Sequence, residues 1–307
     1  MSRTTPHRRS PSRSLSALIL LGLTASAVTA CTGAESASEP RTSLSATRGT
    51  GQPEVAALHM IDNGGHSLAF YVTQGTGPTI VLDSGGGEDS TYWKSLVPEL
   101  HGATGATVIT YDRSGLGKSD VVPGPWQVES AVSDLEAGLE QLGVTEDVTL
   151  VSHSQAGQIA TYFAQDNPTL LSGAVLVDAN LPPLFTDEQI ARLVAFSQPQ
   201  LDAAKKDPDD PQNRQLLSTA ESFVATSTAF HQATWPDAVP ATVIVSEKTP
   251  FDGSPEDVQR WRDAAAAFVE AGPRRTLVTA EGSSHDVLKD RRELVLKEIE
   301  CMVTAQH

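Results

Sequence analysis

Six short, largely apolar segments alternate with stretches of helical periodicity, and this alternation constrains the fold more than any other feature of the sequence. Strands that are apolar along their whole length are buried on both faces, as they are in a parallel sheet covered by helices on each side. We therefore predict an α/β fold with a mostly parallel central sheet and helices on both faces. The apolar segments are residues 79–83, 107–111, 148–152, 173–178, 241–246 and 275–280.

Two further strands are predicted before this alternation begins. Residues 55–61 and 66–73 are joined by "DNGG", and Asn-Gly between two apolar stretches is a strong hairpin signal. The sheet is therefore expected to begin with an antiparallel hairpin. In open sheets of this kind, ligands bind beyond the carboxyl ends of the strands.

Residues 179–240 interrupt the alternation. They contain two helical stretches separated by the polar, proline-containing break "DPDDPQ". An insertion of this size and position is typical of a helical cap over a site, although a pair of peripheral helices would give the same pattern. We predict a core formed by residues 54–178 and 241–307, a length sufficient for one large domain, with residues 179–240 as the cap.

The first 30 residues predict export. Four arginines precede the apolar run "LSALILLGLTASAV", which is too short to span a bilayer and ends in small residues. This pattern is typical of a secretion signal, and the "VTAC" that follows resembles the cleavage site of a bacterial lipoprotein. We expect residues 1–30 to be a signal peptide, Cys31 to be lipidated and residues 31–53 to form a flexible tether. The protein would be a lipoprotein of the bacterial cell membrane facing outside, or otherwise secreted, by the general or the twin-arginine route.

Charge and cysteine content limit the kinds of binding partner and cofactor that the sequence predicts. The chain has 22 basic and 38 acidic residues, and residues 1–30 hold four of the basic ones, so the mature chain would carry a net charge of −20. Such a protein is not expected to bind nucleic acid, and it would reach a membrane only through a lipid on Cys31. Cys301 lies in an apolar-periodic helix and is expected to be buried and outside any disulfide. The sequence has no CxxC or HExxH motif, so no metal or other cofactor is predicted.

The stretch "VTLVSHSQAG" places Ser154 between a predicted strand and a predicted helix. Such a joint holds a serine in a strained turn with its hydroxyl exposed, as in the Gly-x-Ser-x-Gly elbow of nucleophilic serines. Here the flanking positions are Ser152 and Ala156, whose small side chains meet the steric requirement that the glycines serve. The alternative interpretation is an ordinary helix-capping serine.

Two backbone N–H groups are candidates for an oxyanion hole. One belongs to Gln155, at the start of the helix that follows Ser154. The other lies in "LDSGGGEDS", where three glycines let the backbone turn tightly, and we choose Gly86 among them. The rival interpretation is a phosphate-binding loop, which the absence of GxxxxGK[ST] and GxGxxG argues against.

A serine hydroxyl needs a base to take its proton. Of the eight histidines, His285 follows the last predicted strand in a "GSSHD" turn, which suits this role. His153 is expected to point the opposite way from Ser154, and His231, in the predicted cap, has no partner visible in the sequence. His285 is therefore the predicted base.

The order of these features resembles the α/β-hydrolase superfamily over roughly residues 54–305. The shared features are the glycine-rich turn, the "SHSQAG" elbow, the helical insertion and the late "GSSHD". The segment "TVITYDRSGLGKSD" is also similar to that superfamily, and the resemblance implies structural roles for Asp112 and Arg113. It further implies an acyl-enzyme on Ser154 and no cofactor. Dehalogenases of this fold use aspartate at the elbow, so a serine there argues against that activity.

The acid that orients His285 is the least determined assignment. Most members of the superfamily place it shortly after the strand equivalent to residues 241–246, where this chain has Thr249 at the counted position. A minority place it after the preceding strand, where this chain has Asp178. We rank Asp178 first, Asp252 second and Glu247 third.

Together these features predict an exported serine hydrolase of the carboxylesterase type, which cleaves an ester or related acyl bond of a small molecule. One alternative is an aminopeptidase of the same fold, for which Asp202 and Glu221 in the cap would hold the substrate amine. Another is a non-catalytic lipoprotein that binds a ligand in the same pocket. The sequence makes no prediction of oligomeric state.

Overall fold

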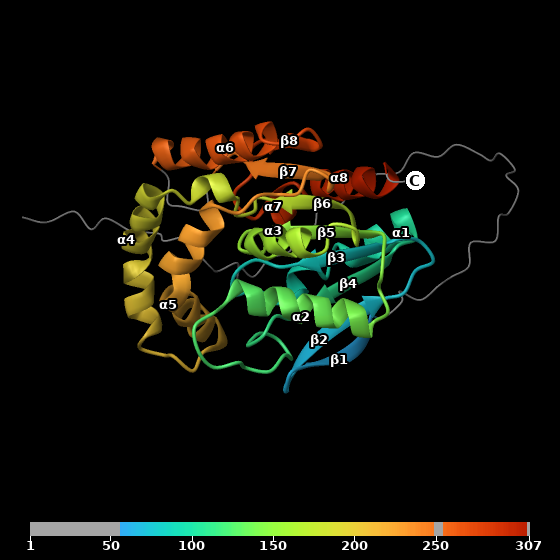
Figure 1. The fold of residues 1–307 in the computed structure, drawn as a ribbon, viewed down its shortest axis with the longest axis horizontal. Helices are drawn as coiled ribbons and strands as arrows, with labels where there is room; N and C mark the ends of the chain where they lie inside the picture. Colours follow the sequence, from blue (N-terminus) through green and yellow to red (C-terminus); the bar gives the residue numbers. More distant parts are fainter. Residues whose placement is uncertain (1–55, 249–253, 306–307) are drawn as a thin grey trace, which may run out of the picture.

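The described part of the chain forms an α/β fold around one eight-stranded sheet, which confirms the predicted fold class. The computed structural model describes residues 56–248 and 254–305 (Figure 1). The predicted signal peptide and tether, Cys31, Thr249 and Asp252 lie outside these residues. The strand order is β1-β2-β4-β3-β5-β6-β7-β8. The strands are β1 (Ala57–Asn63), β2 (His66–Thr73), β3 (Thr79–Asp83), β4 (Thr107–Tyr111), β5 (Val148–His153), β6 (Leu171–Val177), β7 (Ala241–Ser246) and β8 (Arg275–Ala280).

An antiparallel hairpin begins the sheet, as predicted. Strand β1 pairs with β2 in the register that places Asn63 opposite His66, and β2 pairs antiparallel with β4. Gly64 and Gly65, between them, have φ angles of 64° and 102°, which glycine adopts without a steric penalty. The remaining pairs are parallel. The carboxyl ends of β3 to β8 therefore meet at one edge of the sheet.

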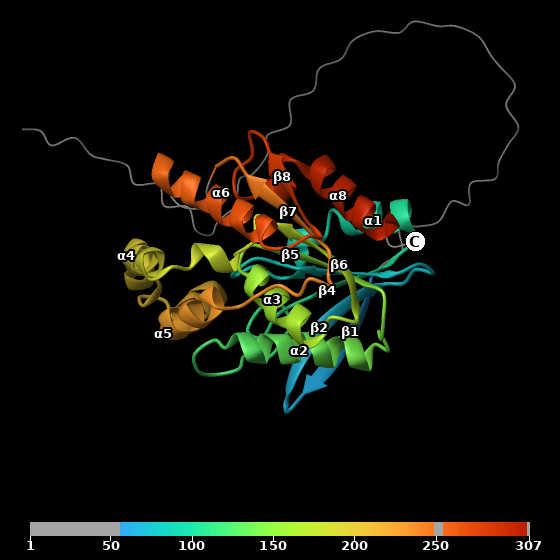
Figure 2. The same ribbon diagram turned by 45° about the horizontal axis from the view of Figure 1, so that its top comes forward.

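Helices cover both faces of this sheet. They are α1 (Val97–Thr104), α2 (Val128–Gln141), α3 (Ala156–Asp166), α6 (Pro255–Glu270), α7 (Val287–Asp290) and α8 (Arg292–Thr304). Figure 2 shows α1 and α8 on one side of the sheet and α2 and α3 on the other. Successive strand side chains point to opposite faces, so Leu150 of β5 packs in the core cluster with α2 and α3, whereas Val151 packs in the cluster with α1 and α8.

Two helices, α4 (Asp187–Ala204) and α5 (Pro211–His231), form the insertion between β6 and β7. Figure 1 shows both at one end of the sheet, on the left in that view. Helix α5 is attached to the core through Gln215, whose side-chain oxygen accepts a 2.8 Å hydrogen bond from the backbone N–H of Gly87. The insertion therefore contacts the glycine-rich turn that follows β3.

Two short helical elements connect β3 to β4. A short 3-10 turn, η1 (Ser90–Trp93), is followed by α1. Pro98 lies at the start of α1, because proline lacks an N–H and is tolerated only in the first turn of a helix. Within residues 56–248 and 254–305, no helix is both long enough and apolar enough to cross a membrane.

Cys301 is exposed, so the prediction that it is buried is wrong. Helix α8 buries one face, made up of Val295, Ile299, Met302 and Val303. Cys301 lies off this face. The apolar period of the helix identifies the helix, but the cysteine belongs to its solvent side.

Candidate active site

Ser154 occupies a sharp joint between β5 and α3. Its φ angle is 54°, a left-handed conformation that residues other than glycine rarely adopt. The joint is tied to the segment after β6, because the Ser154 carbonyl accepts a 2.8 Å hydrogen bond from the Asn180 N–H. A side chain on Gly157 would meet the Asn180 carbonyl oxygen at 2.3 Å, so only glycine allows this approach. The backbone thus has the strained elbow expected of a nucleophilic serine.

The two residues that replace the elbow glycines are fully buried. Ser152, in β5, and Ala156, at the start of α3, each have no exposed surface. Among the described residues, the Ser152 hydroxyl has no hydrogen-bond partner. The position therefore demands a small side chain and makes no use of the hydroxyl.

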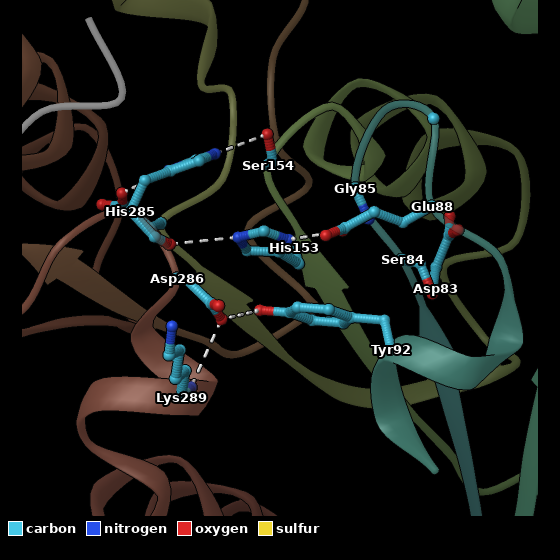
Figure 3. Close-up of polar contacts among 12 residues, drawn as sticks. Asp83, Ser84, Gly85, Glu88, Tyr92, His153, Ser154, His285, Asp286 and Lys289 are labelled. Atoms are coloured by element: carbon cyan, nitrogen blue, oxygen red, sulfur yellow. Dashed lines mark hydrogen bonds and ion pairs between the residues drawn. The ribbon is translucent and has the colours of Figure 1, made fainter. Parts of the chain in front are cut away.

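His285 joins Ser154 to Asp178. Its Nε2 atom lies 2.8 Å from Ser154 Oγ, and its Nδ1 atom lies 2.7 Å from Asp178 Oδ2. Figure 3 shows the His285 ring directed at the Ser154 hydroxyl. A carboxylate only accepts hydrogen bonds, so Nδ1 carries the proton and Nε2 is free to accept the hydroxyl proton of the serine.

Asp178 is the carboxylate that meets His285. It directly follows β6, has a φ angle of 43° and is 1% exposed. Its Oδ1 atom accepts hydrogen bonds of 2.7 Å from the Ser246 backbone N–H and from the Trp261 indole N–H. Three donors on three segments, Ser246, Trp261 and His285, therefore hold this side chain with Oδ2 toward His285.

The other candidate acids differ in what the structure shows of them. The Glu247 carboxylate accepts a hydrogen bond from the Gly282 backbone N–H and does not bond to His285. Asp252 lies outside the described residues. Of the carboxylates ranked from the sequence, the structure brings Asp178 to the histidine.

The glycine turn leaves one backbone donor available. The Gly85 N–H donates to Glu88, and the Gly87 N–H donates to Gln215. Within the part of the chain that the structure describes, the N–H groups of Gly86 and Gln155 have no acceptor. The two residues are neighbours, because a Cβ atom on Gly86 would lie 2.6 Å from Gln155 Oε1. These are the two donors that the sequence indicates for an oxyanion hole.

Arg113 holds the start of the glycine turn in place. Its guanidinium forms a buried ion pair of 3.0 Å with Asp83 and donates to the carbonyl groups of Ser84 and Gly85. Burial raises the pKa of the Asp83 carboxyl, and the charge of Arg113 opposes this shift without cancelling it. Asp112 accepts from two backbone N–H groups on neighbouring segments. The positions of Asp112 and Arg113 agree with structural roles for both residues.

The sequence predicts no role for His153, yet this residue lies beside the predicted base. Its ring centroid is 4.8 Å from that of His285, and it is 3% exposed (Figure 3). Its ring nitrogens contact the Glu88 carboxylate and the His285 carbonyl oxygen. Glu88 lies 65 residues before His153, so no local pattern could have indicated this arrangement.

Other residues considered from the sequence do not gather at Ser154. The His231 Nδ1 atom lies 2.9 Å from the Pro182 carbonyl oxygen. Asp202 and Glu221, considered for an amine site, are exposed on the insertion. In the described ranges, no three His, Cys, Asp or Glu side chains are placed to hold a metal ion.

A family comparison agrees with this geometry. The profile of the alpha/beta hydrolase family matches residues 80–298. This segment covers β3 to α8, including Ser154, Asp178 and His285. The chain belongs to the alpha/beta hydrolase family.

Curated relatives match over a shorter segment. A protein of Mycobacterium tuberculosis described as uncharacterized is 36% identical over 115 residues, which is 38% of this chain and 33% of that protein. A soluble epoxide hydrolase of Corynebacterium sp. is 32% identical over 108 residues, which is 35% of this chain and 37% of that enzyme. The matched segment thus spans about a third of these relatives.

Solved structures are similar over most of the chain. A thermophilic esterase from Thermogutta terrifontis has a TM-score of 0.59 at 23% identity, covering 82% of this chain and all of that one. A bromoperoxidase from Bacillus anthracis has a TM-score of 0.61 at 20% identity, covering 81% of this chain and all of that one. At these identities, the likeness shows the fold.

Proposed function

We propose that the protein is a serine hydrolase that cleaves an ester or related acyl bond through an acyl-enzyme on Ser154. The observation that carries this proposal is the continuous hydrogen-bonded relay from Asp178 through His285 to the Ser154 hydroxyl. A relay of this kind activates a serine, whose hydroxyl is otherwise a weak nucleophile.

In the first step, Ser154 Oγ attacks the substrate carbonyl carbon while His285 Nε2 takes the hydroxyl proton. Asp178 holds the imidazole in the required tautomer and stabilises the imidazolium that forms. The negative charge on the carbonyl oxygen would be received by the N–H groups of Gly86 and Gln155. One such donor contributes about 3–4 kcal/mol to transition-state stabilisation.

In the second step, the same residues release the acyl group. His285 Nε2 gives its proton to the leaving alcohol oxygen, and the acyl group stays bonded to Ser154. A water molecule then loses a proton to His285 and attacks the acyl carbon. The Ser154–acyl bond breaks, the proton returns to the serine, and a carboxylic acid leaves.

An ester is the first substrate class to test. The esterases of Thermogutta terrifontis and Exiguobacterium antarcticum are among the solved structures that share this fold. We further propose that the protein acts outside the cytoplasm, attached to the cell membrane through a lipid on Cys31. Exchanging Cys31→Ser would then move it from the membrane fraction to the soluble fraction.

A fluorophosphonate probe tests the nucleophile directly, because it phosphonylates activated serines. Wild type and Ser152→Ala are expected to be labelled, since the Ser152 hydroxyl has no partner and lies two residues from the elbow. Ser154→Ala is expected to lose labelling. If folded wild type is not labelled, or Ser154→Ala is labelled equally, the proposed hydrolase with Ser154 as nucleophile is wrong; an unlabelled wild type would favour a binding protein of this fold.

A further inference from the structure

His153 is a buried histidine packed between two rings. Tyr92 stacks on one side of it, with 4.8 Å between ring centroids and an interplanar angle of 14°. The His285 ring lies 4.8 Å away on another side. Figure 3 shows the His153 ring between the Glu88 side chain and the His285 backbone, directly below the hydrogen bond that the Ser154 hydroxyl donates to His285.

Both ring nitrogens of His153 face acceptors. Nδ1 lies 3.3 Å from Glu88 Oε2, and Nε2 lies 3.2 Å from the His285 carbonyl oxygen. A carbonyl oxygen accepts only, and Glu88 Oε2 already accepts a 3.0 Å hydrogen bond from the Gly85 N–H. A neutral imidazole has a single N–H and satisfies one of these acceptors. An imidazolium, with two N–H groups, satisfies both.

The pKa shifts of His153 and Glu88 also favour two N–H groups on the His153 ring. Burial by itself lowers the pKa of His153, but the hydrogen bond and the charge of Glu88, together with the His285 carbonyl and Asp178, outweigh it and raise that pKa above its usual value. Burial likewise raises the pKa of Glu88, and the contacts with His153, together with the Gly85 N–H and His285, outweigh it and lower that pKa. Both shifts favour an imidazolium beside a carboxylate.

The glycine turn is shaped to admit this pair. A Cβ atom on Gly85 would lie 2.6 Å from Glu88 Oε2 and 2.9 Å from His153 Nδ1. Gly85 therefore allows the carboxylate to reach across the turn to the ring. The first glycine of the turn serves the pair, whereas the second leaves its N–H free toward the candidate oxyanion site.

We propose that His153 is a positioning residue that carries a second proton, held there by Glu88, and that this charge keeps His285 in its neutral, basic form down to lower pH. The inference rests on the proposed function, since it concerns the protonation of the proposed base. The imidazolium is the end of the pair nearer to His285, so its charge opposes the uptake of a second proton there. Its Nε2–H also fixes the backbone of the loop that carries His285.

Other titratable groups lie around His153 on the neighbouring segments. They form the electrostatic surroundings of the His153 charge. Asp178 accepts a hydrogen bond from the His285 ring, and Asp286 accepts one from the Tyr92 hydroxyl. Burial raises the pKa of Tyr92 well above its usual value, so its phenol stays neutral. The groups are Glu88 and Tyr92 after β3, Asp178 after β6, and His285 and Asp286 before α7.

Three variants test the proposal. His153→Gln keeps an amide donor for the His285 carbonyl but carries no charge, and it leaves the Glu88 carboxylate unbalanced. The acidic limb of its kcat/KM profile is expected to shift to higher pH by about one unit. At a pH on that limb, kcat/KM is therefore expected to be about tenfold lower than in wild type. Glu88→Gln removes the carboxylate and, with it, the second proton of His153, so both charges of the pair are lost. The acidic limb of this variant is expected to shift in the same direction but by less. His66→Gln, at the separate His66–Asp134 pair, is the matched control and is expected to leave the limb unchanged.

Nitrogen NMR of the histidine rings provides a readout that needs no activity. We expect His153 to carry two N–H groups near pH 6, and the titration midpoint of the His285 ring to rise in His153→Gln. A His153 ring with one N–H at that pH, or a His285 midpoint that does not move in either variant, overturns the proposal. If wild type fails to react with the fluorophosphonate while the ring titrations behave as stated, the proposed hydrolase activity fails and the charged pair stands.

Discussion

The indole N–H of Trp261, on α6, donates a 2.7 Å hydrogen bond to Oδ1 of Asp178, whose other oxygen holds His285. Trp261 is 4% exposed and its ring stands edge-on to that of His285, with 6.1 Å between centroids. We expect Trp261→Phe to lower kcat about tenfold, because a hydrogen bond to a charged group contributes about 1.5–3 kcal/mol. Trp235→Phe is the matched control, since that buried indole donates to the Val239 carbonyl away from the site. Equal kcat in the two variants would show that Trp261 only fills space.

Replacing the acid itself is expected to have a larger effect. Asp178→Asn keeps the shape of the side chain but presents an amide to His285, so kcat is expected to fall about 10³- to 10⁴-fold, as loss of a triad carboxylate does. Steady-state hydrolysis of an activated ester measures this. Glu247→Gln and Asp252→Asn are the controls, and a loss in either that matches Asp178→Asn would contradict the assignment.

Replacement by alanine is expected to have opposite effects on stability at Gly157, in the elbow, and at Gly102, in α1. Gly157→Ala would bring a methyl group to 2.3 Å from the Asn180 carbonyl, so we expect a loss of about 1–3 kcal/mol in stability and slower labelling of Ser154. At Gly102, in α1, a Cβ atom meets nothing within 4 Å. Gly102→Ala is expected to stabilise the helix by up to about 1 kcal/mol. Thermal unfolding of the two variants in parallel checks both signs.

The contact between the insertion and the glycine turn is expected to affect the rate more than binding. Gln215→Met preserves the length of the side chain but leaves the Gly87 N–H without its acceptor, beside the candidate donor Gly86. We expect kcat to fall about tenfold with little change in KM, because an unpaired buried N–H costs about 1–3 kcal/mol and the turn shifts to avoid this. Gln215→Glu restores an acceptor and is expected to recover the rate. Wild-type kcat in the methionine variant would rule out this coupling.

The Glu88–His153 pair predicts a pH-dependent part of the stability. The pKa of His153 is raised from 6.5, so this stabilisation is complete below about pH 6.5 and is lost as pH rises through the higher folded value. The pKa of Glu88 is lowered from 4.5, so its share is present above that value and lost on acidification. Unfolding free energies of wild type and Glu88→Gln should differ most near about pH 5–6, by about 1 kcal/mol or less because solvent reaches Glu88.

A control separates this effect from general electrostatics. Glu99 pairs with Arg292 at the surface, and the hydrogen bond from Arg292 lowers the pKa of the Glu99 carboxyl, away from the range of about pH 6 to 9. Glu99→Gln should therefore change stability by the same amount across that range. A pH-independent difference in Glu88→Gln as well would indicate that His153 stays neutral.

Much of the fold was predictable because its signals are local. The predicted strands 79–83, 107–111, 241–246 and 275–280 agree with the structure to the residue, since each is a short β-prone segment bounded by polar or turn residues. Ser154 was predictable for the same reason, because the strand, the small flanking residues and the helix all lie within a few positions of it.

The sequence ranks Asp178 first among three candidate acids but does not decide between them, because the pairing depends on contacts between distant segments. Asp178 and His285 are 107 residues apart, and their pairing requires β6, β7 and β8 to be adjacent in the sheet. Trp261 and Glu88 act through similar long-range contacts. Cys301 shows a different kind of error, since the period of α8 was recognised but the face of the helix that packs on the sheet was not.

Ser154 and Asp178 share a backbone conformation that only glycine adopts without penalty, and they do so at the ends of adjacent strands. The rest of the fold holds two residues where they are locally unfavourable. Selection of this chain for heat resistance alone would therefore favour glycine at position 154, whereas at position 178 the hydrogen bonds from Ser246 and Trp261 oppose that change. The proposed catalytic activity would be lost first, while the fold that carries these residues became more stable.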